Sequence, residues 1–256
     1  MPPLRARFGM PSSRAEVVRG LTTGAFAEQP PNGTEDPSPG VAGAAALPTL
    51  RGFSHAIAFL FAIAAAIVVV ALAPTARATV GPGVYGAALV ALFGGSALYH
   101  RWRGPVRFKS VLQRIDHSTI FVFIAASMTP IALVILHGAL AWVTLAIAWS
   151  GAAAGVAFSL GWVNAPRALT AGSYLLLGWV AVIMLPQALR ALTITPLLLL
   201  AAGGLLYSAG AIVYATQRPN PWPRTFGFHE VFHAFVIAAA AVHYVAILGW
   251  VLPAAR

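Results

Sequence analysis

Seven apolar stretches follow one another from Phe53 onward, and they restrict the fold more than any other feature of the chain. Each is close to the ~20 helical residues that are needed to cross the hydrocarbon core of a membrane. None alternates polar and apolar residues as a transmembrane β-strand would. The sequence therefore predicts an all-α membrane protein, a seven-transmembrane helix bundle, with spans at Phe53–Ala73, Val84–His100, Ile115–Leu136, Ala139–Leu160, Ala168–Leu189, Ile194–Thr216 and Phe228–Leu252.

The composition excludes a water-soluble protein. Of the 256 residues, 59% are apolar and 9% are charged, whereas a soluble domain has roughly 45–50% apolar and about 25% charged residues. So few charges would not keep the surface of a soluble globule hydrated. The chain also has no cysteine, which excludes disulfides, thiolate catalysis and cysteine-ligated metal sites.

The first 50 residues differ from everything that follows. They hold four of the six acidic residues and a run from Pro30 to Gly40 that is rich in proline and glycine. Such a segment has little apolar surface to bury, so we predict a flexible polar tail over residues 1–50 and a membrane domain over residues 51–256. The tail lacks the uninterrupted apolar core of a secretory signal, and an arginine-rich transit peptide is the alternative.

Loop charges predict the orientation in the membrane. The net charge of +10 is interpreted first as loop charge that fixes topology, and not as a surface for nucleic acid. With seven spans, the tail and the loops after spans two, four and six share one side, which is then cytoplasmic, and the C-terminus lies outside. That side carries Arg5, Arg7, Arg14, Arg19, Arg51, Arg101, Arg103, Arg107, Lys109, Arg114, Arg167, Arg218 and Arg224, and the other side carries Arg77, Arg190 and Arg256.

The ionisable residues of the membrane domain converge at one depth. Ionisable groups inside a membrane are costly, so each is a functional candidate. His100 ends the second span at the cytoplasmic side, Asp116 begins the third span there, and His229 and His233 begin the seventh. These four side chains are therefore expected to meet at the cytoplasmic end of the bundle.

The three histidines have the pattern of a metal site. His229 and His233 are four residues apart on a helix, so both imidazoles project from one face and His100 can supply a third nitrogen. Three neutral histidines suit Zn²⁺ and leave its fourth position for water, which is typical of catalytic zinc. Ser96 lies one turn before His100 and can reach the same water or Asp116. Taken singly, a histidine pair is common, and an intramembrane aspartate can instead pair with an arginine such as Arg114.

Several motifs of the chain resemble those of the hemolysin III family, which belongs to the superfamily of progestin and adiponectin receptors and is distantly related to alkaline ceramidases. The resemblance covers roughly residues 50–252. One stretch, Ser127–Pro130, departs from the Gly-Thr-Tyr-Thr-Pro-like pattern of the family, and we expect it to alter a contact of the third span without touching a metal ligand. The motifs that carry the resemblance are Ser96–His100, Arg114–Phe121, Phe226–His233, Ser54-His55, Gly203-Gly204, Tyr207, Gly210, Tyr214 and Gln217–Pro219.

The resemblance implies seven helices around a zinc ion near the cytoplasmic face, with His100, His229 and His233 as ligands and Asp116 with Ser96 holding a water. Related proteins are thought to hydrolyse lipid amides, and bacterial members are linked to membrane lipid homeostasis. We therefore expect a zinc-dependent hydrolase of lipid amides or esters in a bacterial inner membrane, with membrane lipids as partners. The alternatives are a receptor or sensor in which zinc only joins spans two and seven, and a pore-forming cytolysin.

A competing motif overlaps the histidine pair. His229 to His233 satisfies H-E-x-x-H, the metalloprotease pattern in which the glutamate is the base. An intramembrane protease of the site-2 type needs a further acidic ligand downstream, and no acidic residue follows Glu230. Glu230 lies about 100° around the helix from His229, so we expect it to face Arg224 or Arg218 instead.

The remaining histidines are expected to have other roles. His117 directly follows Asp116, so the two cannot both face one metal, and we expect His117 to pack or to hydrogen-bond. His55 has the right depth but no partner at ligand spacing. His243 lies about 15 Å beyond His233 along the helix, too deep for the same ion. His137 belongs to the opposite side of the membrane.

Overall fold

The computed structural model describes residues 48–255, and within them it has seven helical spans long and apolar enough to cross a membrane. This confirms the all-α, seven-span prediction. The predicted tail lies outside the described residues except for its last three, Pro48–Leu50. The elements are α2 (Phe53–Ala71), α3 (Ala76–Arg101), α4 (Val106–Val134), α5 (Ala139–Gly161), α6 (Arg167–Trp179), η1 (Val180–Met184), α7 (Leu185–Ala191), α8 (Ile194–Thr216), α9 (Phe228–Ala246), η2 (Ile247–Val251) and η3 (Pro253–Ala255).

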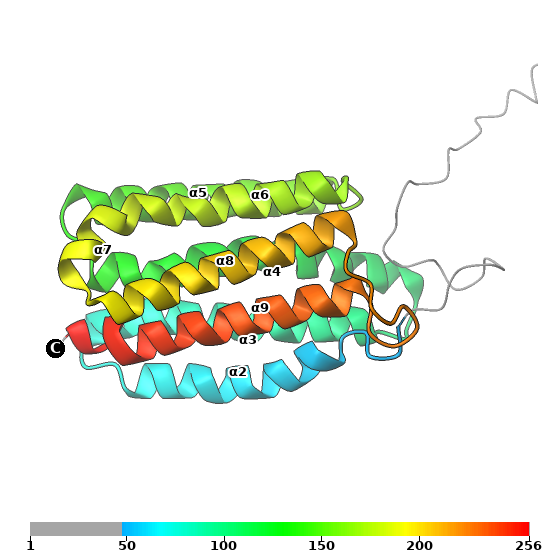
Figure 1. Cartoon of the computed structure of the whole chain (residues 1–256), viewed down its shortest axis with the longest axis horizontal. Coiled ribbons are helices and arrows are strands. Elements are labelled where there is room, and N and C mark those ends of the chain that lie inside the picture. The colour runs from blue at the N-terminus through cyan, green and yellow to red at the C-terminus, as the bar shows by residue number, and fades with distance from the viewer. Residues whose placement is uncertain (1–47, 256) are drawn as a thin grey trace, which may run out of the picture. The chain divides into compact units, whose positions relative to one another are not determined.

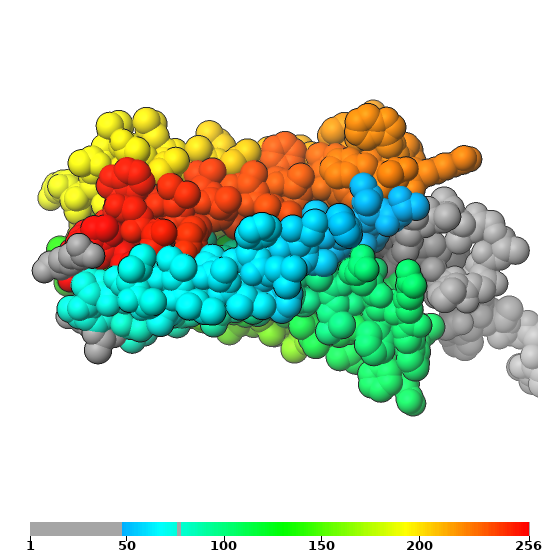
Figure 2. All heavy atoms as spheres, turned by 90° about the horizontal axis from the view of Figure 1, so that it is seen from below, coloured from blue at the N-terminus to red at the C-terminus, as the bar shows by residue number. Residues whose placement is uncertain are grey.

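The helices lie along one common axis. Figure 1 shows α5 and α6 along one side of the bundle, α2 along the opposite side, and α3, α4, α8 and α9 between them. Sequential helices α2 and α3, α3 and α4, and α8 and α9 pack against each other, and α2 also contacts α9. Figure 2 shows the blue surface of α2 beside the red and orange surface of α9. This order brings the end of α3 and the start of α9 to the same end of the bundle. It is called here the basic end, because the helix ends and loops there carry Arg101, Arg103, Arg107, Arg218 and Arg224.

Two helices begin earlier than predicted. α3 begins at Ala76, where the hydroxyl of Thr75 accepts a hydrogen bond from the backbone N–H of Ala78 (3.1 Å). It continues through Pro82, which lies before the predicted start of this span at Val84, because neighbouring helices in a bundle can compensate for a proline in a transmembrane helix. α4 begins at Val106, well before Ile115, since its first turns are polar and extend the helix beyond the apolar stretch. The apolar boundary of a span is thus not its helical boundary.

The fifth span is a helix in two parts. The five residues Val180–Met184 form a 3₁₀ segment between α6 and α7, and Pro186 follows at the start of α7. A proline has no N–H to donate and its ring crowds the preceding turn, which accounts for the change of helix type at this point.

The pairing of α3 with α4 depends on a close approach between Gly81 and Pro130. A Cβ atom on Gly81 would lie 2.7 Å from the Cα atom of Pro130. That neighbour is backbone and cannot rotate away, so the two helices can only be this close with glycine at position 81.

We therefore expect Gly81→Ala to destabilise the protein by about 1–3 kcal/mol, the usual cost of overpacking. The measurement is the thermal unfolding midpoint in detergent. Gly172→Ala is the matched control, because a Cβ on Gly172 would meet nothing within 4 Å and alanine is the better helix former. Equal midpoints for the two variants would contradict the packing described here.

Candidate metal centre

Three histidines from two helices meet at the basic end of the bundle. His100 lies in the last turn of α3, and His229 and His233 lie in the first two turns of α9. One ring nitrogen of each lies within 4.8 Å of the others, close enough to bind one metal ion. The Nε2 atoms of His100 and His229 are 3.0 Å apart. The cluster predicted from histidine spacing and membrane topology is therefore formed.

The three imidazoles fit a shared ion. Their ring centroids are 4.4 to 5.1 Å apart and their planes cross at 61° to 70°, so the rings fan around a common point and do not stack. A tetrahedral ion with nitrogens at about 2.0–2.1 Å holds them roughly 3.3 Å from one another. The 3.0 Å between Nε2 of His100 and Nε2 of His229 is close to that value, and a nitrogen of His233 lies within 4.8 Å of the others, so small side-chain rotations are enough for coordination.

Asp116 and Ser96 stand next to this cluster. The carboxylate Oδ2 of Asp116 lies 3.9 Å from Nε2 of His100, and Asp116 is 8% exposed. This distance is too long for a direct hydrogen bond and short enough for one small molecule to contact both groups. Ser96 is buried in the wall of the same cavity as Asp116. Arg114, the suggested alternative partner of Asp116, donates to the carbonyl of Leu160 (3.1 Å) and to the hydroxyl of Ser110 instead.

Glu230 faces away from the histidines, but its partner differs from the prediction. Its Oε1 atom lies 2.9 Å from Nε of Arg51, and its Oε2 atom accepts a hydrogen bond from the backbone N–H of Gly227 (2.8 Å). The expectation that it faces Arg224 or Arg218 was wrong, because the residue before α2 reaches it first. Glu230 is 1% exposed, and both its oxygens are engaged, so its surroundings are those of a structural residue and not of a free base.

The segment before α2 covers the histidine cluster at the basic end of the bundle. The backbone N–H groups of Thr49 and Leu50 donate to the carbonyls of Arg224 and Thr225 in the α8–α9 loop (3.1 and 3.3 Å). Gly52 follows with φ of 73°, and a Cβ there would lie 2.6 Å from Cβ of His100. A glycine is thus needed both for the turn and for contact with His100.

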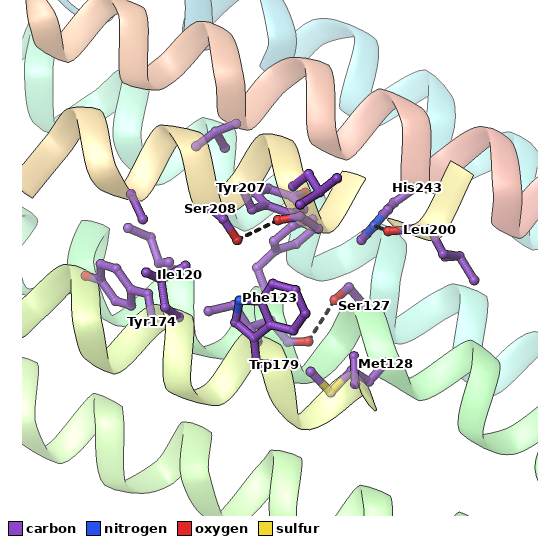
Figure 3. Close-up of a pocket in the computed structure, with 18 of the residues that line it drawn as sticks. Ile120, Phe123, Ser127, Met128, Tyr174, Trp179, Leu200, Tyr207, Ser208 and His243 are labelled. Carbon is purple, nitrogen blue, oxygen red and sulfur yellow. Dashed lines mark hydrogen bonds between the residues drawn. The ribbon is translucent and has the colours of Figure 1, made fainter. Parts of the chain in front are cut away.

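A cavity of about 450 Å³ leads away from the histidines between α4, α6, α8 and α9. Along α4 its lining extends from Asp116 to Ile131, which at 1.5 Å per residue is about 22 Å. Figure 3 shows side chains of the four helices, among them Phe123, Trp179 and Tyr207, pointing toward one another across it. The volume is within the ~300–1,000 Å³ typical of small-molecule sites.

Most polar side chains in the middle of the cavity form hydrogen bonds within the protein. Ser127 donates to the carbonyl of Ile124 (2.8 Å), Ser208 donates to that of Gly204 (2.8 Å), and Nε2 of His243 donates to that of Leu200 (3.1 Å), as the dashed lines in Figure 3 show. These groups are used by the protein itself. Tyr207 is the exception, because its buried hydroxyl has no hydrogen-bond partner among the described residues. The histidines, Asp116 and Ser96 lie together at one end of the cavity, which favours an amphipathic occupant.

His117, His243 and the divergent stretch Ser127–Pro130 lie where the sequence analysis expected them. Nδ1 of His117 donates to the carbonyl of Gln113 (2.8 Å), and His243 stays outside the metal cluster. Ser127 and Met128 line the cavity beyond the histidines of the cluster, while Pro130 contacts Gly81.

His55 is the residue whose position the sequence did not predict. Its ring stacks on the ring of His233, with 3.6 Å between the centroids. No spacing in the chain signals this contact, because it joins α2 to α9.

We expect the purified protein to contain about one metal ion per chain, held by three histidine nitrogens, and His233→Ala to lose most of it. The measurement is elemental analysis after gel filtration. His137→Ala is the control, because His137 is exposed at the other end of the bundle. Full metal content in His233→Ala would show that the ligand assignment is wrong.

Comparison with known proteins agrees with this architecture. The family model described as haemolysin-III related matches residues 45–244. Hemolysin-3 of Bacillus cereus is 32% identical over 208 residues, which cover 80% of this chain and 92% of that protein. Monocyte to macrophage differentiation factor of Homo sapiens is 28% identical over 204 residues, covering 76% of this chain and 80% of that protein. A segment of 46 residues, 16% of this chain and 10% of the relative, is 50% identical to the adiponectin receptor protein of Drosophila melanogaster. This chain is therefore a membrane protein of the hemolysin III family, within the superfamily of progestin and adiponectin receptors.

Proposed function

We propose that this protein is a zinc-dependent hydrolase of lipid amides or esters that takes part in membrane lipid homeostasis. The observation that carries the proposal is the opening of a three-histidine cluster into one end of a long apolar cavity. A structural zinc site usually has four protein ligands, whereas three ligands and an open position are typical of catalysis. The open side here faces the space that a lipid would fill.

Zinc is the metal that this donor set suits best. Three neutral imidazoles are common ligands of Zn²⁺, while magnesium and calcium prefer oxygen ligands. When bound in such a site, zinc polarises a substrate carbonyl and lowers the pKa of its water toward ~7. His100, His229 and His233 would hold it.

Asp116 is the residue that we assign to proton transfer. Its carboxylate is beside His100 and could accept a proton from the water that adds to the carbonyl carbon, then return it to the nitrogen or oxygen that leaves as the amide or ester bond breaks. Ser96, in the same wall, would orient that water or the Asp116 carboxylate by a hydrogen bond. Neither role falls to Glu230, whose oxygens are used by Arg51 and Gly227.

The cavity would hold the acyl chain, and the lipid would enter from the bilayer. Some cavity-lining side chains are also exposed on the outside of the bundle, among them Trp179 at 54%, Val182 at 50% and Leu205 at 62%. They lie on α6, η1 and α8. A route between these elements would let a membrane lipid enter without passage through water.

The basic end is proposed to be cytoplasmic, in a bacterial inner membrane. The uneven distribution of arginine and lysine over the loops supports this orientation. It would place the metal centre near the cytoplasmic face and the C-terminus outside.

A receptor or sensor is the second candidate. The histidines join α3 to α9, so a metal ion could hold the two helices together without chemistry, and the name of the Drosophila relative is that of a receptor. A pore-forming cytolysin, to which the name Hemolysin-3 points, is weaker, since the helices are occupied in spanning the membrane.

Asp116→Asn and Glu230→Gln separate the candidates. We expect wild-type protein to release fatty acid from a panel of lipid amides and esters, and Asp116→Asn to lose about 10²-fold or more of that rate, because an amide cannot accept the proton. The variant should keep its zinc, since such neighbouring changes cost only ~10–100-fold in affinity. Glu230→Gln should lower the thermal midpoint, because it leaves Arg51 without its anionic partner, while folded molecules keep their turnover rate.

The opposite ranking, with Glu230→Gln inactive and Asp116→Asn active, would restore the H-E-x-x-H mechanism. If zinc-loaded wild type releases no fatty acid from any substrate, the receptor hypothesis gains.

The orientation has its own test. A tag at the N-terminus should stay inaccessible in intact cells and a tag at the C-terminus should be labelled from outside, as the excess of basic loop residues at one end predicts. Permeabilised cells, in which both tags should react, are the control. Reversed labelling would move the metal centre to the outer face.

A further inference from the structure

His55 has surroundings that packing alone does not explain. It lies in the first turn of α2, is 3% exposed, and forms part of the cavity wall at the metal end. One face of its ring stacks on His233, at 3.6 Å between centroids and 10° between planes, and Phe93 meets it edge-on at 5.1 Å. Both ring nitrogens are buried, and neither forms a hydrogen bond of ordinary length and angle with another described residue.

A purely apolar role would be filled better by another residue. A phenyl ring offers the same stacking surface, whereas an imidazole brings a donor and an acceptor that are costly to bury without partners. The backbone provides such partners elsewhere in this bundle: His117 and His243 each donate to a carbonyl. The ring of His55 lines the cavity without the carbonyl partner that the rings of His117 and His243 have.

His55 cannot act as a fourth metal ligand in this arrangement. A histidine binds a metal through a lone pair in the plane of its ring, with a bond of ~2.0–2.1 Å. The rings of His55 and His233 are nearly parallel and 3.6 Å apart, so their in-plane nitrogen lone pairs do not converge on a common point. A ligand oxygen held beside His233 would instead be close to the ring N–H of His55.

We propose that His55 is a ligand-binding residue of the metal centre, whose ring N–H donates a hydrogen bond to the oxygen that a carbonyl-bearing lipid headgroup places at the open coordination position. This inference rests on the proposed function, because it requires a metal-bound lipid. It adds a donor from α2 to a site that otherwise consists of residues from α3, α4 and α9.

The test uses the full-length protein in detergent with Co²⁺ in place of zinc, because Co²⁺ absorbs visible light and its spectrum changes when a ligand binds. The probe is palmitoyl hydroxamate, whose oxygens bind the metal and whose chain matches the cavity. We expect His55→Phe to keep its Co²⁺ affinity within about threefold, since the stack on His233 is retained, and to bind the hydroxamate about tenfold more weakly, the usual effect of losing one hydrogen bond to a ligand.

His55→Gln tests the same idea in the other direction, because its side-chain amide restores a donor and should recover most of the hydroxamate affinity. His137→Phe is the matched control, with the same substitution at an exposed histidine far from the metal. His55→Leu, which also lacks ring nitrogens, replaces His55→Phe if the latter does not fold.

Three results of these experiments would overturn the proposal that His55 binds the ligand. Unchanged hydroxamate affinity in His55→Phe would overturn the proposal and leave the metal centre intact. Loss of Co²⁺ from His55→Phe would overturn it too, because His55 would then support His233 and not the ligand. Failure of wild type to bind Co²⁺ would overturn the proposed function together with this inference.

Discussion

The polar side chains of α3, α4 and α9 are gathered at one place because each would be costly to leave facing lipid. His100 near the end of α3, Asp116 within α4, and His229 and His233 at the start of α9 turn inward at the basic end. This requirement constrains the helices that carry them: α3 must end where α9 begins, and the α8–α9 loop must bring α9 back to that level. The bundle therefore has a polar end and an apolar length, and the cavity joins the two.

The start of α9 depends on a second polar contact that lies outside the histidine cluster. Glu230 joins the backbone of Gly227 to the guanidinium of Arg51, so the first turn of α9 is tied to the segment that precedes α2. Because an α-helix advances about 100° per residue, the glutamate can anchor the helix on one face while His229 and His233 serve the cluster on another. The five residues His229–His233 thus contain two histidines of the cluster and also Glu230, which fixes their position.

The sequence predicted well the features that repeat along the chain, such as the spans, and predicted poorly the contacts between residues that lie far apart in the chain. Hydropathy predicted the seven spans, and helix spacing combined with loop charge predicted which histidines would meet. The start of the second span was placed too late, at Val84, because α3 continues through Pro82 and the tolerance of a proline within a helix depends on packing in the bundle. The partner of Glu230 was misassigned, because Arg51 is close only after α2 has docked beside α9. The stack of His55 on His233 has the same origin, a tertiary contact without a sequence signal.

The position of the metal cluster also suits the way lipids lie in a membrane. A lipid keeps its polar head near the interface and its chains toward the middle of the bilayer. The cluster is at the basic end, and the cavity runs from it along about 22 Å of α4, in the direction in which a chain of the adjacent leaflet already points. A lipid moving between α6 and α8 would not have to turn over for its carbonyl group to reach Asp116 and the histidines. The internal hydrogen bonds of Ser127, Ser208 and His243 support this direction, because they leave the unpartnered hydroxyl of Tyr207 among few free polar groups in the middle of the cavity.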